Sequence, residues 1–382
     1  MSGLMPATQV IVNSAELEEA LARIQDGSWV AFDTEFLRER TYYPQLCLVQ
    51  IATSQGSFCV DALQVTDLGP LNEFLALPSR SKVVHAARQD LEALSRLGTT
   101  AVLPLFDTQI AAALAGYPEQ VSYAWIVEEC CGVVLDKSQT RTDWTQRPLS
   151  PEQISYALAD VEYLGPLREH LSRALEPDAK LAWLLEEGER MADSVSLNLD
   201  PQLAWRRLRG ITSLAPAAAA KARALATWRE QQAQSLNCPR GWLLKDEVLL
   251  LLAARSPTNS EELARIDGLG PATIRRHGNA VLELLGGPLA SDSDETLLNW
   301  RLSASGQTLL TGLQAQVKAR AIEVQVAPTL VASRKDLEAL IFDDAPARLL
   351  TGWRAQLVGT ALAERVSAIP LSERRIPAPA RG

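Results

Sequence analysis

Asp33 and Glu35 stand one residue apart at the end of an apolar run. Alternate side chains of a β-strand point to the same face, so a strand here would bring the two carboxylates together. Like charges held so close repel each other unless a cation lies between them. The pair alone also fits an ordinary exposed strand end. Its interpretation therefore depends on which other acidic residues lie nearby.

Two further acidic residues extend this pattern. Asp160 interrupts the apolar stripe of a predicted helix and follows Tyr156 by four residues, so both side chains would lie on one helix face. Asp90 follows the predicted strand that ends at His85, at the start of a helix, where a first-turn role would also explain it. Oxygen ligands from one strand and two helices could bind hard divalent ions, with Mg²⁺ or Mn²⁺ preferred over Zn²⁺.

Short apolar runs alternate with helical patterns over the first part of the chain. Close spacing of the first three runs predicts a hairpin meander, and helical stretches between the later runs predict parallel crossovers. After about residue 175 strand signals nearly vanish, as expected of helical domains. The predicted strands are 29–34, 46–52, 57–61, 82–85 and 103–106, and the predicted helices are 68–77, 87–97, 108–114, 123–131, 151–171 and 181–193.

An internal similarity in the helical part aligns residues 238–250 with residues 327–340, which predicts two copies of one small helical module. In the first copy, Gly268 and Gly270 precede a helix that carries Arg275 and Arg276. Backbone N–H groups and two cations at this place could receive a phosphate, although a plain turn between helices explains the glycines equally well. The second copy lacks this Gly-x-Gly turn.

Charge is unevenly distributed along the chain. Residues 1–170 carry 11 basic and 22 acidic side chains, whereas residues 201–290 carry 12 basic and 7 acidic ones. This asymmetry indicates that the first part depends on a cation and that the later part holds an anionic ligand. A chance distribution of charged residues over solvated surfaces would explain the same counts. The apolar share of 47% excludes a wholly disordered or collagen-like chain.

Targeting and redox signals are weak. No apolar run is long enough to span a bilayer, and the first 24 residues have neither a basic segment nor an apolar core. The five cysteines include no C-x-x-C pair. We therefore expect a cytoplasmic protein with reduced cysteines and without structural zinc or a membrane anchor. The sequence also shows no sign of an obligate protein partner.

The first part of the chain resembles the DEDD exonucleases, in the subclass whose third motif is Tyr-x-x-x-Asp, and within it the ribonuclease D family. The resemblance covers nearly the whole N-terminal domain, and the order of its motifs is highly specific. The two helical copies more loosely resemble the helicase and ribonuclease D C-terminal (HRDC) module. The exonuclease motifs are residues 33–36, 42–46, 85–90, 106–109, 135–138, 142–144, 147–150 and 156–161.

This resemblance implies a ribonuclease H-like α/β mixed-sheet exonuclease domain followed by two all-α HRDC-like modules. Asp33, Glu35, Asp90 and Asp160 would hold two divalent ions, Mg²⁺ or Mn²⁺. Tyr156 would orient the attacking water, because a phenol with a pKa of about 10 is a poor base. The implied bounds are 1–175 for the exonuclease domain, 176–203 for a linking helix, 204–288 and 289–370 for the HRDC-like modules, and 371–382 for a disordered tail.

The implied activity is 3′ to 5′ trimming of tRNA precursors and other small structured RNAs, with release of 5′ mononucleotides. Two alternatives remain at this point: a DNA 3′ to 5′ exonuclease of the same fold, and a catalytically silent nucleic-acid binding protein. His85 is expected to be structural or to support the metal ligands from outside, and Asp107 is expected to cap a helix. The candidate RNA contacts are Lys137, Arg141 and Arg147 around Trp144, where a solvated loop is an equal explanation, and Arg275 and Arg276 in the first helical copy.

Overall fold

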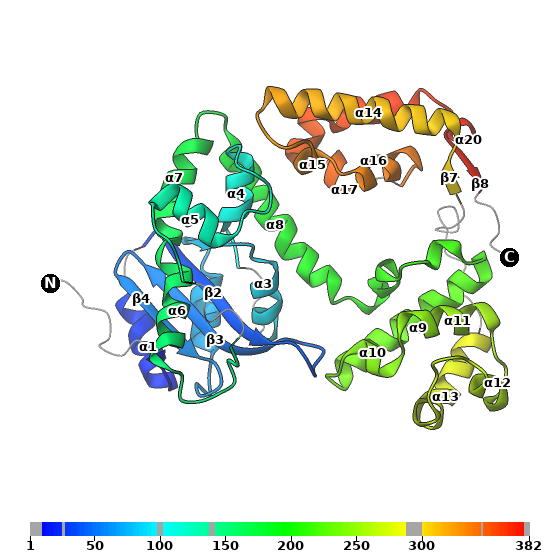
Figure 1. Cartoon of the computed structure of the whole chain (residues 1–382), viewed down its shortest axis with the longest axis horizontal. Coiled ribbons are helices and arrows are strands. Elements are labelled where there is room, and N and C mark those ends of the chain that lie inside the picture. The colour runs from blue at the N-terminus through cyan, green and yellow to red at the C-terminus, as the bar shows by residue number, and fades with distance from the viewer. Residues whose placement is uncertain are drawn as a thin grey trace. The chain divides into compact units, whose positions relative to one another are not determined.

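The computed structural model describes residues 10–24, 27–97, 102–136, 142–287, 300–344 and 347–377. The chain divides into two compact units. Unit 1 runs to Val195 without residues 40–42 and adds residues 324–330, and unit 2 holds the rest. Figure 1 shows the sheet of the first unit and the helices of the second.

Unit 1 is built on a six-stranded mixed sheet with the order β1-β4-β3-β2-β5-β6. Strands β2, β3 and β4 form an antiparallel meander, and β5 and β6 add in parallel beside β2. The predicted meander and parallel crossovers are thus confirmed. The two-residue strand β1, parallel to β4, was not predicted. The bounds are β1 Val10–Ile11, β2 Trp29–Leu37, β3 Gln45–Thr53, β4 Gly56–Asp61, β5 Ser81–Val84 and β6 Leu105–Asp107.

The predicted helices of unit 1 are present except at one break, and one further helix, α1, was not predicted. The predicted helix 151–171 is two helices, α6 and α7, which meet near Tyr163. Gly165 lets α7 approach β2, because a Cβ atom there would lie 2.5 Å from the ring of Trp29. The bounds are α1 Ser14–Arg23, α2 Gly69–Ala76, α3 Arg88–Leu94, η1 Ser95–Leu97, α4 Thr108–Leu114, α5 Tyr123–Cys131, α6 Pro151–Glu162, α7 Leu164–Leu175 and α8 Lys180–Asn198.

The sheet has a different apolar cluster on each face. Phe32 and Ile51 belong to the larger cluster, which also includes residues of α1, α2 and α3. Leu48 and Ala157 belong to a smaller cluster with Trp144, and α6 packs against β2, β3 and β4. Since strand side chains alternate, the face of β2 opposite Phe32 carries Asp33 and Glu35. The strand pattern therefore turns both carboxylates towards α6.

The first helical copy, in unit 2, packs around its own apolar core. Its long helix α9 is followed by the short helix α10 and by α11. Gly268, with φ of +81°, lies in the turn before α13, as the sequence indicated. The bounds are η2 Pro201–Arg207, η3 Ile211–Ser213, α9 Pro216–Ser235, α10 Arg240–Leu243, α11 Asp246–Arg255, α12 Ser260–Ala264 and α13 Pro271–Gly286.

The second helical copy repeats this order, since the long helix α14 is followed by the short helix α15 and by α16. The bounds are β7 Trp300–Leu302, α14 Ala304–Glu323, α15 Pro328–Val331, α16 Arg334–Ile341, α17 Ala347–Leu350, α18 Gly352–Arg354, η5 Ala355–Gly359, α19 Thr360–Ser367, α20 Leu371–Arg374 and β8 Arg375–Pro377. Among the described residues, no helix is both long and apolar enough to cross a membrane.

The prediction of a disordered tail over 371–382 is wrong for its first half. Residues 371–374 form α20, and β8 pairs with β7 in an antiparallel ribbon. Arg374 is 6% exposed and donates a hydrogen bond to the carbonyl of Ile341 at 2.9 Å. This ribbon also shows that the region predicted as a second all-α module includes a strand. Residues 378–382 lie outside the described part of the chain.

Candidate active site

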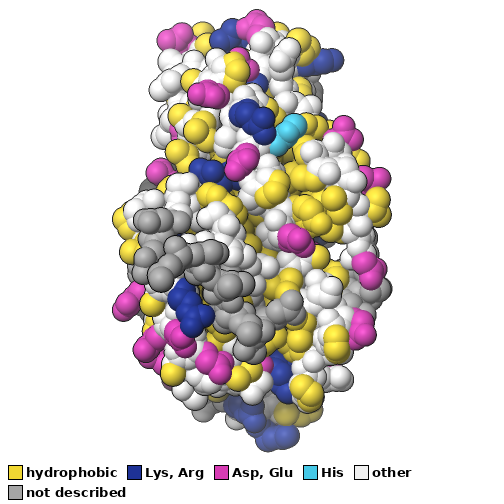
Figure 2. All heavy atoms as spheres, turned by 90° about the vertical axis from the view of Figure 1, so that its left-hand side faces the viewer, with side chains coloured by type: hydrophobic (Ala, Val, Ile, Leu, Met, Phe, Trp, Pro, Cys, Tyr) yellow, Lys and Arg dark blue, Asp and Glu magenta, His cyan; other side chains and the backbone are white. Residues whose placement is uncertain are grey.

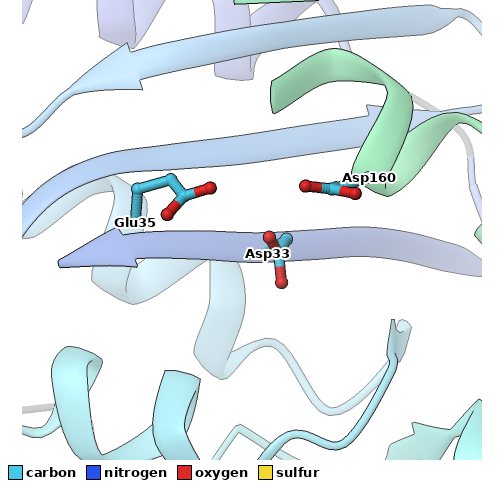
Figure 3. Close-up of side chains that lie close together, drawn as sticks. All are labelled: Asp33, Glu35 and Asp160. Carbon is cyan, nitrogen blue, oxygen red and sulfur yellow. The ribbon is translucent and has the colours of Figure 1, made fainter. Parts of the chain in front are cut away.

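Three of the predicted metal ligands converge beside the sheet. Asp33 and Glu35 extend from β2, and Asp160 reaches them from α6 (Figure 3). One carboxylate oxygen from each residue lies within 4.8 Å of those of the other two. The three oxygens could therefore contact one common cation.

Asp90 completes the acidic group from the first turn of α3. Its Oδ1 accepts hydrogen bonds from the backbone N–H of Thr34 at 3.1 Å and from the Thr34 hydroxyl at 2.6 Å. Thr34 lies between Asp33 and Glu35, so these bonds fix Asp90 to the strand that carries the other two acids. The negative charge of Asp90 contributes to the raised pKa of Asp33.

Burial makes the four carboxylates hold protons strongly when no cation is present, and repulsion from neighbouring acids of the group adds to this effect for Asp33 and Glu35. Burial, followed by the charges of neighbouring acids, raises the pKa of Asp33 well above its usual value and that of Glu35 to about 8. Burial raises the pKa of Asp90 to about 7 and that of Asp160 to about 6. A divalent cation would remove this repulsion, and an all-carboxylate donor set suits Mg²⁺ or Mn²⁺.

Tyr156 lies one helical turn before Asp160 on α6. A hydrogen bond from the Tyr156 side chain partly counters the effect of burial on the pKa of Asp160. The Tyr156 ring lies 6.2 Å from the ring of Trp144, measured between centroids. The phenol is therefore held beside the acidic group, as the Tyr-x-x-x-Asp spacing predicts.

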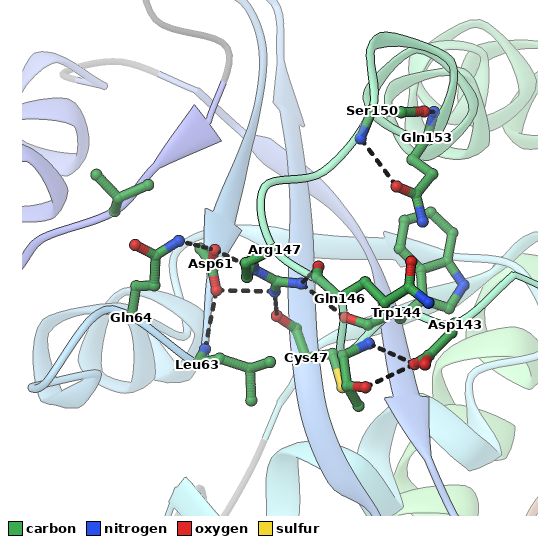
Figure 4. A network of polar contacts seen from close by, with 12 residues as sticks. Cys47, Asp61, Leu63, Gln64, Asp143, Trp144, Gln146, Arg147, Ser150 and Gln153 are labelled. Atoms are coloured by element: carbon green, nitrogen blue, oxygen red, sulfur yellow. Dashed lines mark hydrogen bonds and ion pairs between the residues drawn. The ribbon is translucent and has the colours of Figure 1, made fainter.

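The start of α6 is fixed by its own side chains. Ser150 and Gln153 form a capping box, in which each side chain bonds the backbone N–H of the other residue. The Gln153 amide also donates to the hydroxyl of Thr142 at 3.1 Å. These bonds join the helix that carries Tyr156 and Asp160 to the loop before it (Figure 4).

Arg147 has a structural part in this loop (Figure 4). Its Nε and Nη2 atoms bind both carboxylate oxygens of Asp61, the latter at 2.8 Å. Its remaining N–H groups donate to the carbonyls of Cys47, Trp144 and Gln146 at 2.7 to 2.9 Å. All five donors of the guanidinium are thus engaged. We therefore do not retain Arg147 as an RNA contact.

We expect Arg147→Met to lower the free energy of unfolding by about 3 kcal/mol, because Asp61 is 1% exposed and would lose its counter-ion. Burial acts to raise the pKa of Asp61, but the hydrogen bonds from Arg147 and Gln64 outweigh it and lower that pKa. Chemical denaturation of the full chain measures the change. The control is Arg38→Met, which breaks the exposed ion pair with Glu92 and should cost less than about 1 kcal/mol. An equal loss of unfolding free energy in Arg147→Met and Arg38→Met would contradict the structural role assigned to Arg147.

Tyr123, which no sequence motif marked, supports the end of α6. Its hydroxyl donates to the carbonyl of Ala159 and accepts from the N–H of Tyr163, both at 3.2 Å. These two bonds lie on either side of Asp160 in the sequence. The Tyr123 ring lies beside His85, 5.7 Å between centroids. We infer that Tyr123 positions Asp160.

Replacing Tyr123 by Phe should raise the Mg²⁺ concentration for half-maximal activity by about 10-fold, because outer residues that orient metal ligands affect affinity on this scale. The fold should remain, since the ring is kept. The control is Tyr117→Phe, which removes a hydroxyl that bonds His170 at 3.1 Å instead. An unchanged Mg²⁺ requirement in Tyr123→Phe would show that Asp160 keeps its place without this hydroxyl.

The other predicted residues fall into three groups. His85 is structural, since Nδ1 lies 2.9 Å from the Thr108 hydroxyl and Nε2 lies 2.9 Å from the carbonyl of Val121. Asp107 caps α4 and also accepts from backbone N–H groups before α3. Arg275 and Arg276 are exposed on α13, away from the acidic group in sequence and in a different unit. Lys137 and Arg141 lie outside the described residues.

Comparisons with known proteins agree with this geometry. Residues 8–176 match the model of a family described as 3′-5′ exonuclease, and residues 219–285 match the HRDC domain. The chain is 39% identical to ribonuclease D of Granulibacter bethesdensis, over 93% of this chain and 91% of that one. It is 36% identical to ribonuclease D of Pseudomonas paraeruginosa, over 94% of this chain and 97% of that one.

A solved structure gives the same result. The crystal structure of Escherichia coli RNase D, described as an exoribonuclease involved in structured RNA processing, is similar with a TM-score of 0.87 and 31% identity. The similarity covers 96% of this chain and 100% of that one. Exonucleases of this family use divalent metal ions, and the three converging carboxylates are compatible with that use. With the acidic group, the exonuclease and HRDC matches and relatives along nearly its whole length, the chain belongs to the ribonuclease D family and is a 3′–5′ exoribonuclease.

Proposed function

We propose that this exoribonuclease trims the 3′ ends of tRNA precursors and other small structured RNAs, and that it releases 5′ mononucleotides by two-metal-ion hydrolysis with Mg²⁺ or Mn²⁺. The observation that carries the proposal is the convergence of Asp33, Glu35 and Asp160, with Asp90 fixed beside them by Thr34. The structured RNA in the description of the Escherichia coli relative supports the substrate class.

The residues of the site have separable tasks. Asp33, Glu35, Asp90 and Asp160 would hold the ions. When bound, two divalent ions lower the pKa of water and stabilise charge on a leaving oxygen. Tyr156, held beside Asp160, would orient the attacking water through its hydroxyl rather than take its proton, since a phenol is a weak base near neutral pH.

The substrate test uses the full chain with labelled RNA and DNA of the same sequence, with Mg²⁺ and with a chelator. We expect Mg²⁺-dependent shortening of the RNA from its 3′ end and trimming of a tRNA precursor to a fixed end. Faster degradation of DNA would favour the alternative of a DNA exonuclease. Absence of cleavage of both would favour a nucleic-acid binding protein without activity.

RNA contacts must lie beyond the acidic group itself. On the face drawn in Figure 2, the coloured Lys and Arg side chains are scattered and form no continuous basic surface. The segment 201–290 carries 12 basic and 7 acidic residues, which supports contact with phosphates in the first helical copy. Arg275 and Arg276, both exposed on α13, remain candidates for such contacts.

Changing both Arg275 and Arg276 to Gln should weaken RNA binding and lower the steepness of log affinity against log salt by about 1 to 2. The reason is that binding releases fewer counter-ions from the RNA when fewer phosphate contacts form. Binding to a tRNA precursor, measured in chelator at several salt concentrations, checks this. The control changes Arg301 and Lys318, which are exposed in the second copy, to Gln. If control and test variants change the slope equally, the effect is one of net charge alone.

A further inference from the structure

A pocket of about 360 Å³ opens in the first helical copy, where the end of η2, helices α9 and α10 and the start of α11 meet. Its lining is unusually basic for an acidic protein. Four cations, Arg207, Arg229, Arg240 and Lys245, line it together with Asp246 and Glu247. The pocket is separate in the sequence from Arg275 and Arg276, and the carboxylates of the active site belong to the other unit.

One buried acid holds two of these arginines in place. Glu230 is 0% exposed, and its Oε1 lies 2.7 Å from Arg207 Nη2 while its Oε2 lies 3.2 Å from Arg240 Nε. The pocket lining and Glu230 together contain four cationic side chains and three acidic ones, Glu230, Asp246 and Glu247. Positive charge is therefore in excess, and two guanidinium groups are oriented before any ligand binds.

Arg229 adds a buried donor to the wall of the pocket. Its side chain is 3% exposed, and its Nη1 donates to the carbonyl of Leu244 at 2.7 Å and to Asp246 at 2.8 Å. Its Nε is buried and has no hydrogen-bond partner among the described residues. A buried N–H group without an acceptor is unfavourable, so Arg229 keeps an unused hydrogen-bond donor at the wall of the pocket.

An exposed aromatic side chain follows two of the pocket residues in the sequence. Trp242 follows the pocket residues Arg240 and Gly241 on α10, and it is 62% exposed. A Cβ atom added at Gly241 would meet nothing within 4 Å, so the helix leaves open space there. Sites for single-stranded nucleic acid combine cations that contact the backbone with aromatic rings on which bases stack. Both features occur here within three consecutive residues.

We propose that this pocket binds a phosphodiester group of single-stranded RNA while a neighbouring base stacks on Trp242. The inference rests on the proposed function for its choice of RNA as the nucleic acid. A free phosphate would contact only the cations, so its affinity would not depend on the indole of Trp242. The joint dependence on charge and on stacking therefore distinguishes the two ligands.

The test measures binding of a fluorescent 12-nucleotide single-stranded RNA to the full chain in chelator, so that no cleavage occurs. Trp242→Ala should raise Kd by about 10-fold, the effect of one lost base stack. Lys245→Gln should raise Kd about 3-fold and lower the salt slope by about 1. Both side chains are exposed, so the fold should not change. The matched controls, Leu236→Ala and Arg301→Gln, also alter exposed positions and should bind as the wild type does.

An RNA with an abasic tract separates the two parts of the site. On this ligand Trp242→Ala should lose its effect, whereas Lys245→Gln should keep its effect. The proposal would be overturned if Trp242→Ala bound ordinary RNA as tightly as the wild type does. It would also be overturned if millimolar inorganic phosphate displaced all of the RNA equally well from the wild type and from Trp242→Ala. Cleavage by the wild-type protein is measured in a separate assay with Mg²⁺. If RNA binds through Trp242 but is never cleaved, the proposed function is wrong while the proposed binding site is supported.

Discussion

Asn in place of Asp33 or of Asp160 should abolish nucleotide release, by a factor of about 1,000 or more, while the fold remains intact. Each change removes a ligand from the group whose oxygens lie within 4.8 Å, and the loss of a bound ion forfeits several kcal/mol of transition-state stabilisation. Single-turnover cleavage of a labelled RNA measures the effect.

The same variants should melt at an unchanged or higher temperature in chelator. Burial and neighbouring acids raise the pKa of Asp33, which means that its charged form is unfavourable in the folded protein without a cation. Asn removes that charge and keeps the shape. The control is Asp193→Asn, an exposed acid on α8, which should keep full activity. Substantial activity in both active-site variants would refute the assignment of the metal ligands.

Phe in place of Tyr156 should slow the chemical step by about 100-fold, with RNA affinity retained. The ring would keep its contact with Trp144, and only the hydroxyl that bonds Asp160 would be lost. The measurement compares single-turnover rate with Kd for the same RNA. Tyr163→Phe is the control, on the residue that joins α6 to α7. Turnover near that of the wild type would show that the Tyr156 hydroxyl has no part in hydrolysis.

The acidic pair on β2 could be predicted because it depends on local geometry alone. Strand alternation placed Asp33 and Glu35 on one face, even though β2 continues to Leu37, beyond the predicted end at residue 34. Helical spacing likewise placed Tyr156 and Asp160 together. These inferences needed only the two periods of regular secondary structure.

Contacts between distant parts of the sequence could not be predicted in this way. Arg147 pairs with Asp61 across 86 positions, and the hydroxyl of Tyr123 meets the carbonyl of Ala159 across 36. Arg147 lies in an exonuclease motif and Tyr123 in none, but neither position reveals its distant partner in the sequence. The three-residue strand β8 was likewise taken for a tail, because a short Pro- and Arg-containing segment carries no periodicity that could show its pairing with β7.

Metal dependence and direction of cleavage together show whether the converging carboxylates hold divalent ions that hydrolyse RNA from its 3′ end. Protein freed of metal by chelator is mixed with 5′-labelled RNA that ends in a 3′ single strand, and Mg²⁺ is then added. We expect no cleavage before Mg²⁺ is added. After addition, a ladder should form that shortens one nucleotide at a time from the 3′ end and releases 5′ monophosphates, and Asp33→Asn should give no ladder. Internal cuts, or a ladder that forms in chelator, would contradict this expectation.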